Sequence, residues 1–409
     1  MKIFSPLIIA LLVLCIIFSE KINARQVATK TLLNVKDYGV KGDNIYDDGP
    51  AIQKVLDRAG GMNGAIVFFP DGTYQITDPG NGDSGMGKYG LRISSNTTLQ
   101  LAEKAVLHKN GNDELISNKD QVKGNSNIVI TGGTFETASG TDQKWAPGRI
   151  GIKFVNVTKS KIKRCNFRHI GNSGVSLQEN SNDNIISDCS FTDIYNCAVE
   201  VLHGERNIIT RNYLHEMGSD GILVNGDDCI ISLNRLKNIG QYSAPSLGSG
   251  ISLGVDNHPC KGNKVLNNTI YGTAAFGIIN DRSANSSIEG NTITNTGSAA
   301  IKIGGGGYNS IVKKNTIKNT GLSKETKGVY IHSGIIVDGE DVQLLDNKLT
   351  YVTGTGIFIN RNAHGAIVKQ CTVSHIIRAK NDDAVTSTAI EIKANNVVIG
   401  KIKHKNIAN

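Results

Sequence analysis

The residues of this chain that can carry out acid–base chemistry gather in the middle of the sequence. Glu200 and His203 lie close together, Asp220 follows, and Asp256 and His258 form a second close pair. A histidine near a carboxyl group can transfer protons, and catalysis of this kind needs neighbouring groups of opposed acid–base character. These five side chains are the first candidates for a site, provided that the fold brings them together.

Basic residues flank this segment on both sides. Removing a proton beside a carboxylate needs a base, often a separate acid, and a cation that stabilises the developing charge. Lys153, Arg282 or Lys302 would hold the carboxylate, and His203 or His258 would transfer protons. The catalytic candidates are His203, Asp220, Lys153 and Arg282. The substrate-binding candidates are Trp145, Gln178, Glu200, Asn225, Asp256, His258 and Lys302.

An internal repeat of about two dozen residues carries these positions. Each copy opens with a small residue followed by alternating aliphatic residues, as in Gly151-Ile152-Lys153-Phe154. Two further short strands follow in each repeat, separated by turns rich in Asn and Gly, which accept a left-handed backbone. The copies begin at Gly151, Gly174, Ala198, Gly221, Gly250, Gly277, Ala300, Gly334, Gly356 and Ala389.

One such coil cannot bury its inward side chains alone. Stacking at roughly 4.8 Å per coil pairs each strand with its neighbour and builds a continuous core. The repeat therefore predicts an all-β fold, a single-stranded right-handed parallel β-helix. A leucine-rich horseshoe is disfavoured because no helices separate the strands, and a propeller is disfavoured because its blades need about 40 residues.

The N-terminal segment has a different pattern. Asp47 and Asp48 precede Pro50, and Ile52, Val55, Leu56 and Ala59 then recur at helical spacing before two glycines. These are start and stop signals of one amphipathic helix. We expect its apolar face to cap the open end of the solenoid, and the aspartates to serve the turn and the cap.

Here the sequence resembles a known superfamily. The segments Val35–Asp43 (VKDYGVKGD), Asp47–Asp48, Ala51–Gln53 and Val67–Tyr74 (VFFPDGTY) are similar to the N-terminal segment of the pectate-lyase superfamily. Rhamnogalacturonase-like, epimerase-like and phage tailspike β-helices share that segment. The resemblance covers residues 33–77 as the N-terminal cap, and the repeated coils cover 126–403. It implies a pectin-lyase-like solenoid that works on a polysaccharide.

The resemblance leaves several reactions open. Removal of the C5 proton of a uronate residue leads to a lyase or to a C5-epimerase acting on an acidic polysaccharide. Many relatives use Ca²⁺, and Glu200, Asp220 and Asp256 would be its oxygen ligands. The sequence itself commits to no metal, and no CxxC or HExxH spacing indicates zinc.

Two alternatives remain. Gly226-Asp227-Asp228-Cys229 resembles the paired-aspartate phrase of polygalacturonases, although Ser249 and Ala300 stand where that family has His and Arg. Inverting hydrolysis would then use Asp220, Asp227 and Asp228. The other alternative is a non-enzymatic, carbohydrate-binding β-helix, which needs no perturbed acid–base pair.

Length variation between coils points to one decorated edge. Insertions collect just before the small-aliphatic strand, and the first of them holds Trp145, the single tryptophan. Function usually resides in such loops on a rigid scaffold. The insertions are Ala138–Arg149, Gln241–Gly248, Gly321–Ser333 and Ala379–Thr388.

The chain begins like an exported protein. Lys2, an apolar run from Pro6 to Phe18 and the small residue Ala24 predict a signal peptide over residues 1–24. The remaining residues 25–409 would form one domain, secreted or extracellular, or periplasmic in a Gram-negative host, with no membrane association. Losing Lys2, Lys21 and Glu20 lowers the formal charge from +8 to +7.

That positive charge favours an acidic polymer as partner. Nucleic acid is disfavoured, because the lysines are scattered and no basic helix or aromatic stacking motif occurs. Six cysteines remain after cleavage, too few for a disulfide scaffold in a domain of this size. Cys165 and Cys189 occupy equivalent positions of adjacent repeats, which predicts stacked buried thiols.

Overall fold

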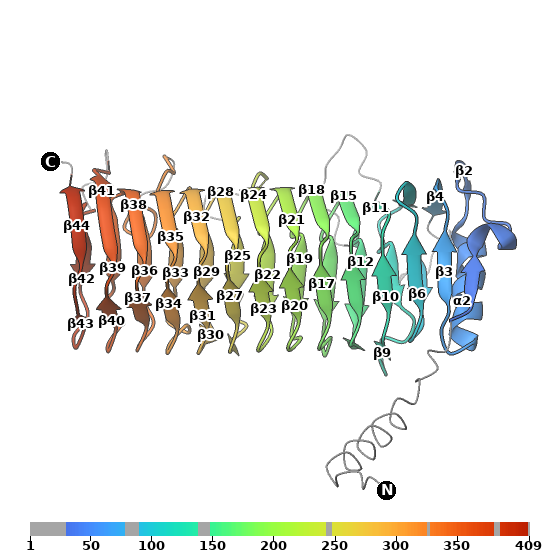
Figure 1. The fold of residues 1–409 in the computed structure, drawn as a ribbon, viewed down its shortest axis with the longest axis horizontal. Helices are drawn as coiled ribbons and strands as arrows, with labels where there is room; N and C mark the ends of the chain where they lie inside the picture. The colour runs from blue at the N-terminus through green and yellow to red at the C-terminus, as the bar shows by residue number, and fades with distance from the viewer. Residues whose placement is uncertain are drawn as a thin grey trace, which may run out of the picture.

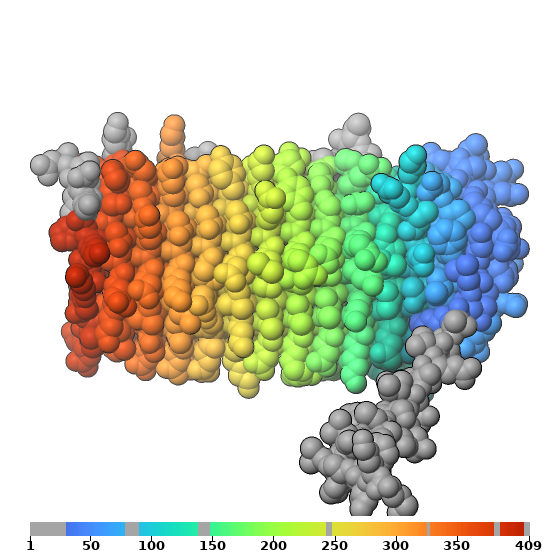
Figure 2. All heavy atoms as spheres, viewed as in Figure 1, coloured from blue at the N-terminus to red at the C-terminus, as the bar shows by residue number. Residues whose placement is uncertain are grey.

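The computed structural model shows a right-handed parallel β-helix whose coils follow one another along the long axis of the molecule (Figure 1). The structure describes residues 30–77, 90–137, 148–242, 248–324, 328–379 and 385–407. The predicted signal peptide and Trp145 lie outside these residues. Figure 2 shows the coils as successive bands of colour across the long axis, so neighbours in the repeat order are neighbours in space.

Three long parallel sheets run along the solenoid, and each coil contributes one strand to each sheet except the first and last coils, which have no strand in the third sheet. We call them sheets A, B and C in the order in which the chain visits them. Sheet A consists of β1 (Leu32–Asn34), β3 (Ile66–Phe69), β6 (Thr98–Leu101), β10 (Val129–Thr131), β14 (Lys161–Lys163), β17 (Ile185–Ser187), β20 (Ile208–Thr210), β23 (Ile230–Ser232), β27 (Lys264–Leu266), β31 (Ser287–Glu289), β34 (Ile311–Lys313), β37 (Gln343–Leu345), β40 (Ile367–Lys369) and β43 (Val398–Ile399).

Sheet B consists of β2 (Asp43–Asp47), β4 (Gly72–Thr77), β7 (Ala105–Asn110), β11 (Thr134–Thr137), β15 (Asn166–Ile170), β18 (Ser190–Ile194), β21 (Tyr213–Met217), β24 (Arg235–Ile239), β28 (Thr269–Thr273), β32 (Thr292–Thr296), β35 (Thr316–Thr320), β38 (Lys348–Thr353), β41 (Thr372–Ile377) and β44 (Lys403–Ile407).

Sheet C consists of β5 (Leu91–Ile93), β8 (Ile116–Asn118), β12 (Ile152–Val155), β16 (Val175–Gln178), β19 (Val199–Leu202), β22 (Ile222–Asn225), β25 (Ile251–Leu253), β29 (Ile278–Asn280), β33 (Ile301–Ile303), β36 (Ser333–Val337), β39 (Thr355–Ile359) and β42 (Ile390–Ile392). Two short pairs join neighbouring turns: β9 (Asn125–Ser126) with β13 (Val157–Thr158), and β26 (Cys260–Lys261) with β30 (Ser283–Ala284).

The fold prediction is confirmed. The strands that open the repeats in the sequence are those of sheet C, and strands before residue 126 join the same three sheets. Alternation along each strand fills the interior with aliphatic side chains. Identical residue types stack from coil to coil, as in Phe135, Phe167 and Phe191, whose ring centroids lie 5.0 and 4.8 Å apart.

A buried ladder of asparagine side chains lines the bend between sheets A and B. The Nδ2 atom of each asparagine donates to the Oδ1 atom of the next at 3.0 Å and also to a backbone carbonyl of the preceding coil. Each Oδ1 atom that accepts a side-chain amide also accepts the backbone N–H of the asparagine in the preceding coil. The ladder consists of Asn212, Asn234, Asn268, Asn291, Asn315 and Asn347.

The capping helix is also confirmed. A 3-10 turn, η1 (Val35–Tyr38), leads into α2 (Gly49–Gly61), which covers the N-terminal end of the solenoid (Figure 1). Its apolar residues are buried. Asp48 accepts the backbone N–H groups of Lys41 and Gly42 at 2.6 and 2.7 Å, so it stabilises the turn, as expected.

All six cysteines of the described residues are buried with free thiols. Burial raises the pKa of Cys165, and the neighbouring Cys189 thiol adds to the effect, so these are inert, stacked thiols. Within the described ranges no helix is both long and apolar enough to cross a membrane.

Replacing Asn268 by alanine is expected to destabilise the protein. Neighbouring amide and carbonyl groups lose their partners inside the ladder, and each such loss costs roughly 1–3 kcal/mol, so we expect a total of about 3 kcal/mol. The midpoint of urea unfolding measures the change. Thr269→Ala, at the exposed next position, is the control and should stay within about 0.5 kcal/mol of the parent. Equal midpoints for the two variants would contradict the proposed role of the ladder.

Candidate functional site

The outward side chains at the centre of the sheet C strands form one continuous row. Register places Lys153 next to Ser176, Ser176 next to Glu200, and Lys302 further along the same row. Glu200 is two coils from Lys153, roughly 10 Å, and four coils from Lys302, roughly 19 Å. The complete row is Arg92, Ser117, Lys153, Ser176, Glu200, Leu223, Ser252, Ile279, Lys302, Ile336, Phe358 and Glu391.

Lys153 has a partner that the sequence did not reveal. Its Nζ atom forms an ion pair with Glu114 Oε1 at 2.7 Å, and the Glu114 side chain is nearly buried. Glu114 precedes Gly151, where the first repeat recognisable in the sequence begins, so an alignment of the repeats could not have placed it beside Lys153. The charge of Lys153 is therefore largely balanced within the protein.

Glu200 is a buried carboxyl group on the outer side of the sheet. Only 9% of the residue is exposed. Burial raises its pKa, while the hydroxyl groups of Ser176 and Ser173 and the charge of Lys153 act in the opposite direction. The neutral form of Glu200 is thereby favoured, which makes this residue a potential proton donor.

Asp220 lies just before β22, at the edge of sheet C where the strands begin. Its Oδ1 atom accepts the backbone N–H of Ser249 at 2.7 Å. Burial raises the pKa of Asp220; the Ser252 hydroxyl and the Ser249 N–H lower it, and the nearby charge of Asp256 raises it again. Asp220 is thus held by the turn of the following coil.

His203 and His258 meet at the opposite edge, where the sheet C strands end. His203 follows β19 and His258 follows β25, yet His203 Nε2 lies 3.1 Å from His258 Nδ1. The turn of the intervening coil holds Gly226, where a Cβ atom would lie only 1.8 Å from the Gly204 carbonyl oxygen. The backbones of these neighbouring turns are therefore in close contact, and the two imidazoles approach each other from turns two coils apart.

Arg282 lies at the same edge, after β29, in the coil that follows His258. It interacts with the neighbouring Asp281 at 3.6 Å, and its side chain is about two-fifths exposed. The backbone carbonyl of Arg282 accepts the N–H of Cys260, which ties its turn to that of His258. The structure therefore brings His203, His258 and Arg282 together at one edge and leaves Asp220 at the other.

The remaining substrate-binding candidates have varied surroundings. Gln178 donates to Ser176 Oγ at 2.9 Å, so it packs against the central row. Asn225 is buried, and its Oδ1 atom accepts the backbone N–H of Val255, which is the contact of a turn residue. Asp256 is exposed, in a left-handed turn with φ 57°.

Lys302 sits among aromatic rings that the sequence did not connect with it. Its Nζ atom lies 5.8 Å from the ring centroid of Phe276 and 5.5 Å from that of Tyr330, and 3.7 Å from Asp281. The Tyr330 hydroxyl donates to Asp338 at 3.0 Å. Burial and the charge of Asp338 raise the pKa of Tyr330 to about 12. Tyr330 comes from a predicted insertion, whose path the repeat cannot specify.

A comparison with known protein families shows to which family the chain belongs. Residues 32–244, about half of the chain, match the family described as rhamnogalacturonase A/epimerase, pectate lyase-like, and residues 201–334 match the right-handed β-helix region. The chain belongs to the rhamnogalacturonase A/epimerase, pectate lyase-like family. The resemblance seen in the N-terminal segment is thereby confirmed.

Individual relatives of this family member have differing activities. Plasmin and fibronectin-binding protein A of Streptococcus pneumoniae is 33% identical over 192 residues, which is 44% of this chain and 24% of that protein. Alginate lyase 7 of Azotobacter vinelandii is 29% identical over 144 residues, 32% of this chain and 16% of that protein. The matches to these curated relatives span only about a quarter of their length or less.

A solved structure agrees over nearly the whole chain. The A-module of mannuronan C-5 epimerase AlgE6 from Azotobacter vinelandii superimposes with a TM-score of 0.72. The superposition covers 91% of this chain and 99% of that module, at 15% identity. At this identity the likeness concerns the fold.

The Ca²⁺ hypothesis does not fit the side chains of this family member. Glu200 is buried against serine hydroxyl groups, and Asp220 is held by a backbone N–H. The described part of the chain contains no group of three or more His, Cys, Asp or Glu side chains arranged to hold a metal ion. Glu200, Asp220 and Asp256 do not form a common ligand set.

The hydrolase alternative needs a pair of nearby carboxylates, and the structure keeps Asp220 and Asp227 too far apart to form one. Asp220 precedes β22 and Asp227 follows it, so a strand of roughly 13 Å separates them. An inverting pair needs a separation of about 6.5–9.5 Å. Asp227 accepts the backbone N–H of Lys261, and Asp228 lies in a left-handed bend with φ 53°. Both are turn residues.

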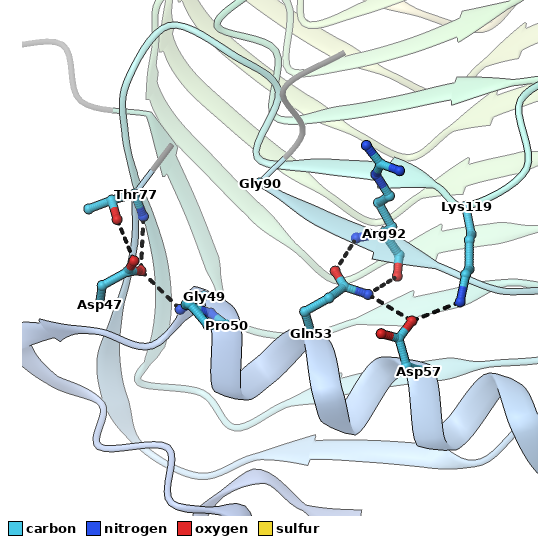
Figure 3. Close-up of a pocket in the computed structure, with 9 residues that line it drawn as sticks. All are labelled: Asp47, Gly49, Pro50, Gln53, Asp57, Thr77, Gly90, Arg92 and Lys119. Atoms are coloured by element: carbon cyan, nitrogen blue, oxygen red, sulfur yellow. Dashed lines mark hydrogen bonds and ion pairs between the residues drawn. The ribbon is translucent and has the colours of Figure 1, made fainter. Parts of the chain in front are cut away.

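A cavity of about 460 Å³ lies elsewhere, between α2 and the first coils (Figure 3). Its polar lining is satisfied internally: Gln53 exchanges two hydrogen bonds with the Arg92 backbone, and Asp57 pairs with Lys119 at 2.8 Å. This cavity belongs to the junction of cap and coil and contains none of the candidate residues.

The raised pKa of Glu200 predicts a pH-dependent stability. The folded chain favours the neutral acid, so its contribution is fully present below the ordinary carboxyl pKa and is lost as pH rises through the raised pKa. Glu200→Gln cannot ionise. Its thermal midpoint relative to the parent should therefore increase between about pH 4 and pH 8.

Glu136→Gln supplies a control of opposite sign. Burial acts to raise the pKa of Glu136, but hydrogen bonds and charges of His108 and Arg168 lower it overall. Its stabilising contribution is present above the ordinary pKa and is lost as pH falls. This variant should be most destabilised at neutral pH, and the same trend for both variants would refute the burial argument.

Proposed function

We propose that this protein removes the C5 proton from uronate residues of an acidic polysaccharide at the edge of sheet C. The observation that carries the proposal is the contact of His203 and His258 at 3.1 Å, with Arg282 in the next coil. The proposed edge cluster, His203, His258 and Arg282, combines a proton carrier with a cation for a carboxylate. The chain is also proposed to act outside the cytoplasm, on the strength of its N-terminal segment.

The chemistry of the edge cluster follows from its parts. When one of the facing imidazole nitrogens donates its proton to the other, the donor ring has a free lone pair on its second nitrogen, and the acceptor ring carries its proton on its own second nitrogen. The ring with the free lone pair takes the C5 proton, and the electron pair moves into the uronate carboxylate. Arg282 stabilises the charge that develops there.

Two outcomes then divide a lyase from an epimerase. If the C4–O bond breaks and the leaving oxygen takes a proton, the chain is cleaved and an unsaturated sugar forms. If a proton returns to C5 from the other face, the sugar is inverted without cleavage. Glu200, whose buried carboxyl group favours the protonated form, is a candidate donor in either case.

The relatives support this class of substrate. One is named an alginate lyase and another a mannuronan C-5 epimerase, so both act on uronate polymers. The formal charge of +8 for the full chain suits a polyanionic partner. A second candidate, a non-catalytic binding protein, is favoured by the 33% identity to a plasmin- and fibronectin-binding protein.

His203→Ala and His258→Ala should each lower turnover by about 100-fold or more, because general acid–base catalysis contributes roughly 10²–10⁴-fold. The substrates to test are alginate, pectate and glucuronan, with and without EDTA. Ultraviolet absorbance reports unsaturated product, reducing ends without it report hydrolysis, and proton NMR reports altered epimer ratio. His364→Ala, an exposed histidine four coils beyond His258, is the matched control and should retain full activity.

If His203→Ala retains full turnover, the edge cluster does not carry out the proton transfer. Retention of the parent protein on these polymers with no product under any condition would instead favour the binding protein. Loss of activity in both His203→Ala and His364→Ala would indicate a general effect on folding, which circular dichroism of each variant reveals.

A further inference from the structure

The outer face of sheet B is rich in cations and hydroxyl groups in the C-terminal half of the solenoid. Over the strands β24, β28, β32, β35, β38 and β41 its outward side chains form two parallel rows. One row reads Arg235, Thr269, Thr292, Thr316, Lys348 and Thr372. The other reads Lys237, Tyr271, Thr294, Lys318, Thr350 and Ser374. Cations, hydroxyl groups and one aromatic ring thus alternate along the axis. We call this surface the sheet B track.

The charge of the track has one sign. Arg235, Lys237, Lys318 and Lys348 are all exposed, and the six strands contain no Asp or Glu. Lys237 and Lys318 are three coils apart, roughly 14 Å, and Arg235 and Lys348 four coils apart, roughly 19 Å. On the neighbouring strand β21, Glu216 contacts His215 at 3.5 Å. The excess of cations on the six strands favours a partner that carries several negative charges along its length.

The N-terminal half of the same face is different. There Glu136 pairs with Arg168, and His169 contacts Asp193 at 2.7 Å. Positive groups in that half are neutralised within the protein, so the unbalanced charge begins at β24. This boundary within one sheet distinguishes the track from a generally basic surface.

Exposed aromatic rings lie on or beside the track. Tyr271 is 46% exposed in the second row, and Tyr351, within β38, is 39% exposed. Tyr351 stacks on His375 with ring centroids 4.6 Å apart, and Lys318 Nζ lies 5.6 Å from the Tyr351 ring. Exposed, positioned rings beside hydroxyl groups and cations suit the faces and substituents of sugar rings.

The repeat of the track suits a polymer. One set of side chains recurs per coil, at roughly 4.8 Å, which is close to the length of one pyranose residue in an extended chain. A polysaccharide lying along the axis would therefore meet an equivalent row position with each sugar. A single anion could contact only one part of the track, whereas an extended polyanion can reach cations that lie three or four coils apart.

We infer that the sheet B track is a binding site for an anionic polysaccharide chain lying along the helix axis. It is separate from the edge cluster, because sheets B and C form different sides of the coil. Lys237, Lys318, Arg235 and Lys348 bind the acidic groups, and Tyr271 stacks on a sugar face. The inference does not depend on what reaction takes place at sheet C.

Affinity electrophoresis of the full chain tests the inference, in gels that contain alginate, polygalacturonate, uncharged dextran or poly-glutamate. The background carries His203→Ala and Glu200→Gln, so that turnover at sheet C does not consume the polymer. Lys237→Glu with Lys318→Glu should weaken retention by alginate or polygalacturonate about tenfold or more, and added salt should weaken retention of the parent background.

The matched control reverses two charges on another face. Lys161→Glu with Lys264→Glu changes exposed lysines of sheet A by the same net charge. If binding is local to sheet B, retention of this control variant should weaken by less than about threefold. Equal weakening of retention in the two double variants would show that only net charge matters and would overturn the inference.

Tyr271 tests whether sugars are recognised. Tyr271→Ala should weaken retention by the uronans, and Tyr271→Phe should restore it, with unchanged thermal midpoints for both. Retention by poly-glutamate as strong as by the uronans, with no effect of Tyr271→Ala, would identify a site for any polyanion and overturn the polysaccharide assignment. Retention by dextran would overturn the role of charge.

Discussion

The structure depends on one constraint: every coil must repeat the same bend between sheets A and B. The buried asparagine ladder meets that constraint, because each side-chain amide donates to the amide of the next coil, donates to a backbone carbonyl of the preceding coil and accepts a backbone N–H from that coil. An insertion at this bend would leave several buried polar groups without partners. At the bend between sheets C and A, buried Asn184, Asn207 and Asn263 make similar contacts with the backbone, but Cys229 interrupts the series. The longer uninterrupted ladder therefore lies between sheets A and B, and the longer turns flank sheet C.

That asymmetry decides where chemistry can arise. Because the ladder fixes sheets A and B relative to each other, their outward rows are regular, and the sheet B track inherits this regularity. The edge after sheet C tolerates variation, so His203 and His258 come from turns of different form, two coils apart, and still lie in contact. The regular face suits binding of a repeating polymer, and the irregular edge suits a local cluster of acid, base and cation.

The coil repeat, the cap helix and the stacked thiols could be predicted because each follows from local periodicity. Glu200, Lys153 and Lys302 were also placed on one row, since alignment of Gly-Ile and Ala-Val openings gives the register directly. The ion pair of Lys153 with Glu114 could not be predicted, because Glu114 lies where the repeat is not legible. The rings of Phe276 and Tyr330 around Lys302 depend on the path of an insertion, which spacing does not encode.

The same periodicity explains why the fold is easier to read than the function. Inward positions are mostly aliphatic or aromatic, with small polar residues, asparagines and cysteines at the bends, so proteins of this architecture share the same pattern. Similarity to an alginate lyase, an epimerase module and a host-protein binder is therefore compatible with one scaffold. These functions depend on the set of side chains that face outward from the coils. In this chain, that set places two imidazoles in contact, a buried acid in the central row and an unbalanced line of cations on another face, a combination for which the scaffold has no structural need.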